Sequence, residues 1–420
     1  MDNVKSINLT HMWDGRILEG MNQRHPRPET LALHPRSGST PQRGPVATPI
    51  YQSATFRFLN SDMDQGRPVS QVLGDSFYTR YGNPTNSVAE SLLAELEGGE
   101  AALVFSSGMA AITSAVLSVV RSGDHVVAQR ELYGGAFDFL IRWLPKFGVG
   151  VSFVPAADPP DFAAAIRPTT RLLYLESPSN PTLQVAGLAE LAAMARRRGI
   201  LTFVDNTAAS PINQRPLELG ADVVVHSASK YLAGHSDIVA GAAVGSRTLI
   251  DALREERTVL GGCLDPHAAW LLIRGIKTLG VRMDRINQNA LELARFLEGH
   301  PRVKQVHYPF LESHPQYALA RAQMRGGGGL LSVELRGTAG EARRFVESLH
   351  LFAQAPSLGG VESLVTLPAS TSHTQLSPVE RQEAGIGDNL VRMSVGLEHI
   401  DDLTADIEQA LQAAVEEVVP

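Results

Sequence analysis

Cysteine and long apolar runs are both scarce in this sequence. Cys263 is the single cysteine in a chain of 420 residues, so an internal disulfide is impossible and no second thiol exists for a metal site. No uninterrupted apolar stretch approaches the roughly 18 residues of a membrane span, and the N-terminus lacks the apolar core of a signal peptide. We therefore predict a cytoplasmic protein without metal ligands or membrane contact.

Positive charge is also in short supply. The chain carries 37 lysines and arginines against 44 acidic residues, which gives a formal net charge of -7. This balance argues against general binding of nucleic acid or of an anionic membrane surface. A Walker A pattern and a Gly-x-Gly-x-x-Gly motif after a strand are both missing, so nucleotide binding has little support. A hydrophobic content of 44% is typical of a globular protein.

Apolar strand patterns alternate with helical patterns between residues 88 and 245, and a second alternation follows after a largely helical stretch at 247–300. The first alternation predicts a mostly parallel sheet with right-handed crossovers, whose ligands bind at the carboxyl ends of the strands. The second predicts a smaller α/β domain. The predicted divisions are an irregular leader at 1–28, an extended arm and loop at 29–76, a large α/β domain at 77–262 and a C-terminal α/β domain at 263–420.

Two chemically active residues follow neighbouring predicted strands. The β-branched run at 222–225 is followed by Ser227, Ser229 and Lys230. Hydroxyls beside a lysine suit a phosphorylated aldehyde, because they can hold the phosphate while the amine condenses with the aldehyde. An earlier apolar run ends in Asp205, a carboxylate that could keep a pyridine nitrogen protonated. A surface lysine and a strand-end turn residue are the ordinary alternatives, but the pair is more specific than either residue alone.

Several segments resemble motifs of the Cys/Met-metabolism, or trans-sulfuration, family of pyridoxal 5'-phosphate (PLP) enzymes. This family includes methionine γ-lyase, cystathionine γ-lyase, cystathionine γ-synthase and the homoserine-ester sulfhydrylases. The resemblance implies PLP fold type I, like that of aspartate aminotransferase. One departure is Ser229, where threonine is usual, and the hydroxyl is kept. The similar segments, in family order, are Tyr78–Thr85, Ser106–Met109, Tyr133–Gly135, Glu176–Pro181, Asp205–Thr207, His226–Ser236, Ser357–Leu364 and Arg392–Glu398.

The resemblance also implies roles for individual residues. The residues implied to bind the cofactor are Lys230, Asp205, Thr207, Ser227, Ser229, Ser107, Gly108, Met109, Tyr133, Tyr78, Arg80 and Asn180. The residues implied to bind the substrate are Arg392, Ser357, Asn180 and Tyr78. Lys230 and Tyr133 are the implied catalytic residues. Because Tyr78 and Arg80 reach the cofactor of an adjacent subunit in the family, we expect a homo-oligomer, a tetramer of active dimers.

Ordinary structural roles remain open for most of these residues. Arg80 could pair with a local carboxylate, Ser106 or Ser107 could be a helix N-cap, and Tyr133 could be a half-buried loop tyrosine. Asn180 could form an Asx-turn, and Arg392 could be solvated at the surface of a strand.

The implied reaction is γ-elimination or γ-replacement on a sulfur-containing or homoserine-ester L-amino acid. In that reaction the amine of Lys230 moves protons, and Tyr133 is the candidate general acid or base. Two alternatives stay open. The first is other PLP chemistry, such as β-elimination, transamination or a specialised γ-substitution. The second is a non-catalytic binding or scaffold protein.

Three positions bear on the substrate. Gly135 stands where methionine γ-lyase has a distinctive cysteine, and Arg257-Thr258 stands where it has Lys-Asp, which weakens the expectation of methionine specificity. Asp138 stands where cystathionine-handling relatives usually carry arginine. A carboxylate there would repel a distal carboxylate, so we predict poor use of succinyl esters and cystathionine and better use of neutral γ-groups. The alternative is that Asp138 points to solvent.

Overall fold

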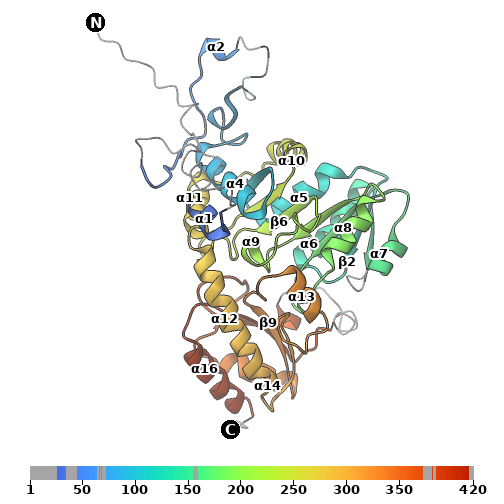
Figure 1. The fold of residues 1–420 in the computed structure, drawn as a ribbon, viewed down its shortest axis with the longest axis vertical. Helices are drawn as coiled ribbons and strands as arrows, with labels where there is room; N and C mark the ends of the chain where they lie inside the picture. Colours follow the sequence, from blue (N-terminus) through green and yellow to red (C-terminus); the bar gives the residue numbers. More distant parts are fainter. Residues whose placement is uncertain are drawn as a thin grey trace.

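The computed structural model describes residues 26–34, 45–63, 66, 68, 72–154, 159–371, 381 and 385–415. Most of the predicted leader therefore lies outside the described residues. The described chain contains two β-sheets, each covered by helices, one in the upper and one in the lower half of the molecule (Figure 1). The N-terminal arm projects from the upper half, and α2 (Asn60–Met63) lies near its tip.

The upper sheet has seven strands in the order β1-β7-β6-β5-β4-β2-β3. Strand β7 is antiparallel to both of its neighbours, and the other pairs are parallel. The predicted mostly parallel sheet is confirmed. Its strands are β1 (Ala101–Phe105), β2 (His125–Gln129), β3 (Gly150–Val154), β4 (Thr170–Glu176), β5 (Leu201–Asp205), β6 (Val223–Ser227) and β7 (Gly241–Gly245).

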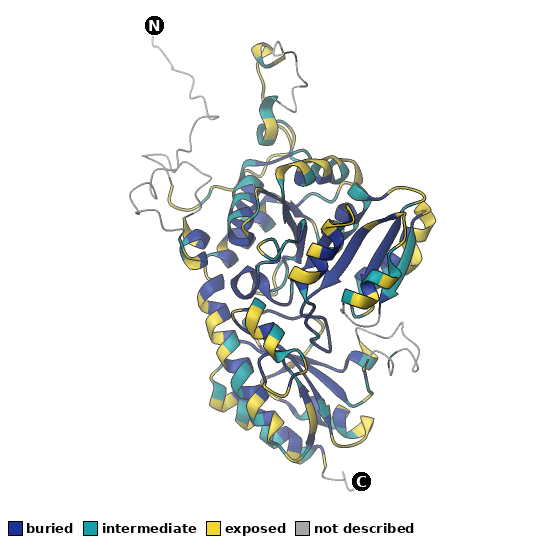
Figure 2. Ribbon diagram, turned by 45° about the vertical axis from the view of Figure 1, so that its right-hand side comes forward, coloured by how far each residue is buried: buried dark blue, intermediate teal, exposed yellow. Residues whose placement is uncertain are grey.

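Both faces of this sheet are buried, which explains why its strands are apolar throughout. In β4, Leu172 and Tyr174 pack on one face, while Leu173 and Leu175 pack on the other. Figure 2 shows the strands as largely buried, and the edge strand β3 is of intermediate burial at four of its five residues. The first face is covered by α5 (Gly108–Val119), α6 (Gly134–Asp138) and α10 (Arg247–Leu260), and the second by α4 (Pro84–Glu97), α7 (Pro159–Ala165) and α8 (Leu188–Arg196).

The lower sheet has five strands in the order β10-β11-β12-β9-β8. The predicted second α/β region is present, although β10 is only two residues long and β11 was not predicted. The strands are β8 (Val303–His307), β9 (Leu330–Leu335), β10 (Ala353–Gln354), β11 (Leu364–Thr366) and β12 (Leu390–Ser394). The helices of this part are α13 (Tyr317–Gln323), α14 (Ala339–Ser348) and α16 (Ile400–Ala413).

Helices α11 (Pro266–Ile276) and α12 (Leu279–Glu298) join the two halves. The first turns of α12 place Met283 and Ile286 in the core beside α4, whereas Leu293 and Leu297 belong to the lower core. The helix therefore runs down one side of the molecule and is shared by both cores (Figure 1). The predicted domain division at residue 262 stays a prediction.

One local prediction was wrong, and one helical segment is irregular. The arm is not extended throughout, because α1 (Pro28–Leu33) buries Leu31 against α4 and α12, and Pro28 occupies its first turn. The segment at 136–147 is not one regular helix. After α6 it continues as a π-helical turn, η3 (Phe139–Trp143), and a 3-10 turn, η4 (Leu144–Phe147), where Pro145 cannot donate a backbone hydrogen bond.

Candidate active site

The start of α5 and the end of β6 form a tight cradle. Ser107 is the N-cap of α5, and its hydroxyl accepts a hydrogen bond of 3.0 Å from the N–H of Ala110. A Cβ atom added to Gly108 would lie 2.9 Å from the Cβ of Ser227, so only glycine lets the two segments meet. The first N–H groups of a helix have no partner within the helix, so those of Gly108 and Met109 are left without a partner inside α5. Such a helix start binds phosphate.

The hydroxyl of Ser229 is already engaged. It donates to the carbonyl of Ala240 at 3.2 Å and accepts from the N–H of the same residue at 2.9 Å. Ser229 therefore ties the turn after β6 to the start of β7. Its predicted contact with the phosphate stays a prediction.

Asp205 ends β5 with a buried side chain. One oxygen, Oδ1, accepts hydrogen bonds from the N–H of Thr207 at 2.9 Å and from its hydroxyl at 2.5 Å. The same hydroxyl accepts from the N–H of Ser227 at 2.8 Å. Burial raises the pKa of Asp205, and the bonds from Thr207 act in the opposite direction. Among the described residues no donor reaches Oδ2, so this oxygen is available to a protonated ring nitrogen.

Lys230 is not a surface lysine. Its Nζ donates a hydrogen bond of 2.6 Å to the hydroxyl of Ser357, a residue that follows β10 in the lower half of the molecule. Burial, together with the positive charge of Arg392, lowers the pKa of Lys230, which favours the neutral, nucleophilic amine. Ser357 has a φ of +126°, which side chains rarely adopt, so the surrounding structure holds this residue in a strained conformation.

Arg392 lies on β12 and is buried. Its Nη2 donates to the carbonyl of Ser357 at 2.9 Å and its Nη1 to Oδ1 of Asn180 at 3.3 Å. Burial lowers its pKa to about 10. Within the described part of the chain it has no carboxylate partner, so its positive charge remains available to a carboxylate. Arg392 is not solvated, and the side chain of Asn180 is bonded to it across the two sheets rather than to a local turn.

Tyr133 follows β2 and lies beside the start of α5. Its N–H donates to Oε2 of Glu176 at 2.6 Å, and 45% of the residue is exposed. A Cβ atom on Gly135 would lie 2.6 Å from Cε1 of Tyr133 and 2.9 Å from the sulfur of Met109. The ring therefore occupies the space that a side chain at 135 would need.

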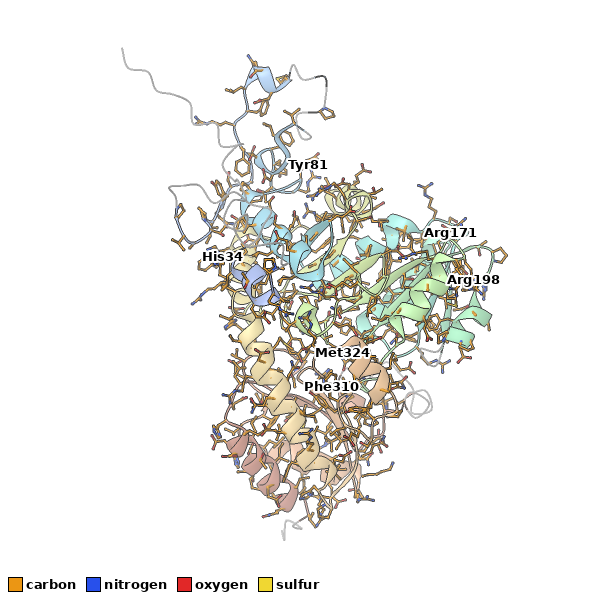
Figure 3. All side chains as sticks on the ribbon, in the orientation of Figure 1. His34, Tyr81, Arg171, Arg198, Phe310 and Met324 are labelled. Carbon is orange, nitrogen blue, oxygen red and sulfur yellow. The ribbon has the colours of Figure 1, made fainter. Side chains whose placement is uncertain are left out.

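Tyr78 and Arg80 lie apart from these residues. Arg80 donates from Nη1 to the carbonyl of Thr258 at 2.8 Å, and its guanidinium lies 5.1 Å from the ring centre of Tyr81. Figure 3 places Tyr81 at the base of the projecting arm. No hydrogen bond among the described residues links Tyr78 or Arg80 to Lys230. The partner of Arg80 is a carbonyl rather than the local carboxylate of the alternative interpretation.

Two residues of this region were given no role at the level of sequence. Glu176 ends β4 directly opposite Asp205 in the sheet register, is buried, and receives the N–H of Tyr133. Burial and the nearby charge of Asp205 raise its pKa well above the usual range. An apolar run ending in a carboxylate is the pattern that identified Asp205, so the same signal was present. Arg282 on α12 is the second residue without an assigned role.

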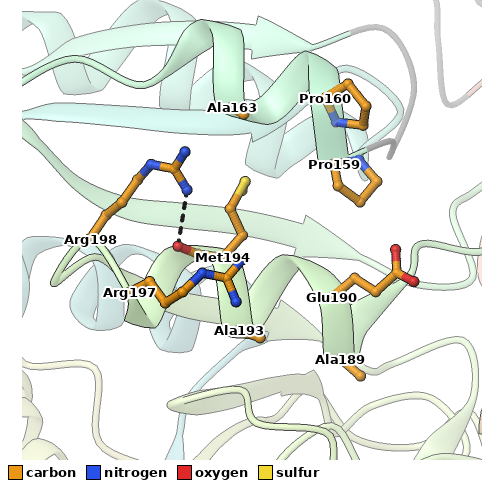
Figure 4. A pocket seen from close by; sticks show the side chains of 9 residues that line it. All are labelled: Pro159, Pro160, Ala163, Ala189, Glu190, Ala193, Met194, Arg197 and Arg198. Carbon is orange, nitrogen blue, oxygen red and sulfur yellow. Dashed lines mark hydrogen bonds between the residues drawn. The ribbon is translucent and has the colours of Figure 1, made fainter.

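A concavity lies between α7 and α8, on the outside of the sheet (Figure 4). Its volume is about 590 Å³. None of the predicted site residues lines it. Its walls are formed by Pro159, Pro160, Ala163, Ala189, Glu190, Ala193, Met194, Arg197 and Arg198.

The residues at the carboxyl edge of the upper sheet fit PLP at three separate points. The α5 start with Ser227 fits the phosphate, the free oxygen of Asp205 fits the pyridine nitrogen, and Lys230 fits the aldehyde. The cradle that a Cβ on Gly108 would fill supports this match. Together with a mostly parallel sheet and a smaller second α/β half, this arrangement is that of a PLP-dependent enzyme of fold type I.

The chain belongs to the Cys/Met metabolism PLP-dependent enzyme family, whose sequence model matches residues 29–412. It is 48% identical to L-methionine gamma-lyase of Pseudomonas putida over 387 residues, which cover 92% of this chain and 97% of the relative. It is 43% identical to cystathionine gamma-lyase of Bacillus subtilis, covering 91% and 99%. It is 42% identical to cystathionine beta-lyase of Coxiella burnetii, covering 93% and 99%.

Proposed function

We propose that this enzyme catalyses γ-elimination or γ-replacement on a sulfur-containing or homoserine-ester L-amino acid. One observation carries the proposal. The hydroxyl of Ser357 accepts a hydrogen bond from the amine of Lys230, and its carbonyl accepts one from the guanidinium of Arg392. A proton-transfer group and a carboxylate-binding group therefore lie next to the same residue. Relatives that are named methionine and cystathionine gamma-lyases support the reaction class.

Each residue then has a defined task. PLP, when bound, supplies an electron sink for the carbanion at the substrate α-carbon. Arg392 binds the α-carboxylate, and this places the α-proton within reach of the neutral amine of Lys230. Asp205 keeps the cofactor ring nitrogen protonated. Tyr133, half exposed beside the helix start, is the candidate acid for the leaving γ-group or the base for the incoming amine.

Asp138 bears on the nature of the γ-group. Its Oδ1 accepts a hydrogen bond of 3.0 Å from Arg142, one turn later in the chain, and both side chains are partly exposed. This pairing weakens the field of the carboxylate but leaves no net positive charge for a distal carboxylate. We therefore keep the proposal that acetyl and thioether groups are preferred. Turnover of O-acetyl- against O-succinylhomoserine tests it, and a clear preference for the succinyl ester contradicts it.

We also propose a homo-oligomer, a tetramer of active dimers, in which Tyr78 and Arg80 complete the site of a neighbour. Large apolar side chains remain exposed on the arm and at the end of α10, which supports a second subunit there. They are Ile50, Tyr51, Phe58, Leu59, Met63, Val259 and Leu260. Analytical ultracentrifugation of the active holoenzyme tests this proposal, and a fully active monomer contradicts it.

The proposed location is the cytoplasm. In the part of the chain that the structure describes, no helix has both the length and the apolar character to cross a membrane.

Product analysis over a panel of amino acids, with and without an added thiol, tests the proposed reaction. We expect a 2-oxo acid and ammonia from γ-substituted substrates, and a new thioether when a thiol is present. If only products of β-elimination or transamination form, the enzyme catalyses another PLP reaction and the proposed reaction is wrong. A purified protein that is never yellow with PLP, and shows no colour to bleach with borohydride, would point to a non-catalytic role.

A further inference from the structure

Helix α12 carries a buried arginine in an unfavourable position. Only 4% of Arg282 is exposed, and burial lowers its pKa to about 10. It lies in the first turn of α12, where the helix dipole disfavours a cation, and among the described residues no carboxylate pairs with it. Burial of an unpaired guanidinium costs free energy unless its donors are used.

Both terminal nitrogens of Arg282 donate to the turn that follows Lys230, while Nε donates to the hydroxyl of Thr278 at 3.2 Å. Nη1 donates to the carbonyl of Tyr231 at 2.7 Å, and Nη2 donates to the carbonyl of Leu232 at 3.4 Å. Nη2 also donates to the carbonyl of Gly275 at 2.8 Å, near the end of α11. One planar fork therefore connects the backbone directly after Lys230 to the junction of α11 and α12.

Two glycines allow this close approach. Gly234 has a φ of +75°, and a Cβ atom on it would lie 2.1 Å from Nη1 of Arg282. A Cβ atom on Gly275 would lie 2.2 Å from the carbonyl oxygen of Ala233. The turn itself is closed by a hydrogen bond of 2.8 Å from the N–H of Gly234 to the carbonyl of Lys230. The turn is thus pressed against both the guanidinium and α11.

The opposite side of the turn is equally constrained. A Cβ atom on Gly359 would lie 2.6 Å from the backbone nitrogen of Tyr231 and 3.1 Å from the carbonyl carbon of Lys230. The hydroxyl of Tyr231 accepts a hydrogen bond of 3.1 Å from the N–H of Gly329. The peptide between Lys230 and Tyr231 therefore lies between Arg282 and the loop that carries Ser357.

We propose that Arg282 is a positioning residue for Lys230. By holding the carbonyls of Tyr231 and Leu232, it fixes the backbone from which the lysine side chain extends toward Ser357. A lysine at 282 cannot do this, because an ammonium group lacks the rigid fork that reaches several carbonyls in one plane. The proposal rests on the role given to Lys230 in the proposed function. The competing interpretation is that Arg282 only caps α11.

The test compares holoenzymes of the wild type, Arg282→Lys and Gly275→Ala. The second variant keeps the arginine but pushes a methyl group against the turn. The control is Leu403→Ala, which weakens the lower core on α16 and touches no part of the turn. The readouts are the pH midpoint of the visible absorbance band, the rate of borohydride trapping at Lys230, and kcat and KM separately.

We expect Arg282→Lys and Gly275→Ala to move the pH midpoint in the same direction and to slow borohydride trapping. We also expect kcat to fall about 10²-fold, as a misplacement of about 1 Å produces, with little change in KM. Leu403→Ala should lower the melting temperature and leave the midpoint at its wild-type value. If Arg282→Lys folds and keeps the wild-type midpoint and kcat, or if Leu403→Ala shifts the midpoint equally, the positioning role is overturned. If Arg282→Lys does not fold, Gly275→Ala alone decides by the same criteria.

This experiment separates the two proposals. A wild-type holoenzyme that traps PLP on Lys230 but turns over no γ-substituted amino acid overturns only the proposed reaction. The absorbance and trapping data then still test Arg282, because they need no substrate.

Discussion

Replacing Arg392 by lysine should weaken substrate binding far more than it affects the fold. The two terminal nitrogens of the guanidinium, Nη1 and Nη2, make hydrogen bonds of different lengths. The bond to the carbonyl of Ser357 is 2.9 Å long, while the bond to Asn180 is 3.3 Å, longer than is usual for N–H donors. The side-chain oxygen of Asn180 is therefore the partner of Arg392 that a substrate carboxylate can replace at small cost.

Lysine retains the positive charge but lacks the two donor nitrogens that the guanidinium holds in one plane. One charge-assisted hydrogen bond is worth about 1.5–3 kcal/mol, so KM for an amino-acid substrate should rise about 10- to 150-fold. The effect on kcat should be smaller, because the carboxylate is bound both before and during proton removal. Steady-state kinetics on any accepted amino acid measure both parameters.

Two controls separate carboxylate binding from damage to the strand. Val391→Ala removes two methyl groups from the preceding residue of β12, which belongs to the lower core, so stability should fall while KM stays within about twofold. On the ligand side, the corresponding amine without an α-carboxylate should bind the wild type and Arg392→Lys equally, as followed by the cofactor absorbance. If KM for the amino acid is unchanged, or if the carboxylate-free amine loses as much affinity as the amino acid, Arg392 does not bind the α-carboxylate.

Three further results are expected. Lys230→Ala should give a colourless protein after desalting and no turnover, and turnover at the wild-type rate would overturn the whole account. Asp205→Asn should remain folded, since an amide oxygen still accepts the bonds from Thr207, but kcat should fall about 10²- to 10³-fold because a buried charge partner is lost. Burial lowers the pKa of His314 to about 4, from about 6.5 in an unfolded chain, so the unfolded state takes up the proton first as the pH falls. The free energy of unfolding should therefore drop by about 1–2 kcal/mol between pH 6.5 and 4, allowing for solvent screening. In urea titrations, the free energy of unfolding of His314→Gln should depend less on pH than that of the wild type. An equal dependence on pH in both proteins would refute this.

The main features of the upper half were predictable from sequence because they follow from general rules. A mostly parallel sheet must be apolar on both faces, and its ligands must gather where strands end, so Asp205 and Lys230 stood out at the ends of their apolar runs. Glu176 obeys the same rule and was overlooked, although its signal was present. The three-residue strand β11 has too short a pattern to be read from sequence.

Other parts depend on contacts that no local pattern encodes. Arg282 keeps the helical spacing of its neighbours Leu279, Met283 and Ile286, so an arginine on that apolar stripe marks an anomaly without naming its partner. Only the tertiary structure shows that the partner is the backbone after Lys230. The positive φ of Ser357 is likewise not a preference of serine, and this residue bonds to both Lys230 and Arg392.

The geometry of the site depends on how the two halves of the molecule are joined. Lys230 comes from the upper sheet, while Ser357 and Arg392 come from the lower half, and the hydrogen bond of 2.6 Å between Lys230 and Ser357 crosses this junction. Helix α12 belongs to both cores and carries Arg282 at the end that holds the Lys230 turn. A shift of the lower half would therefore move Arg392 relative to the amine of Lys230. A change at Arg282 would instead move the amine relative to both Ser357 and Arg392. The two kinds of variant should differ in kinetics, because the first alters KM and the second alters kcat.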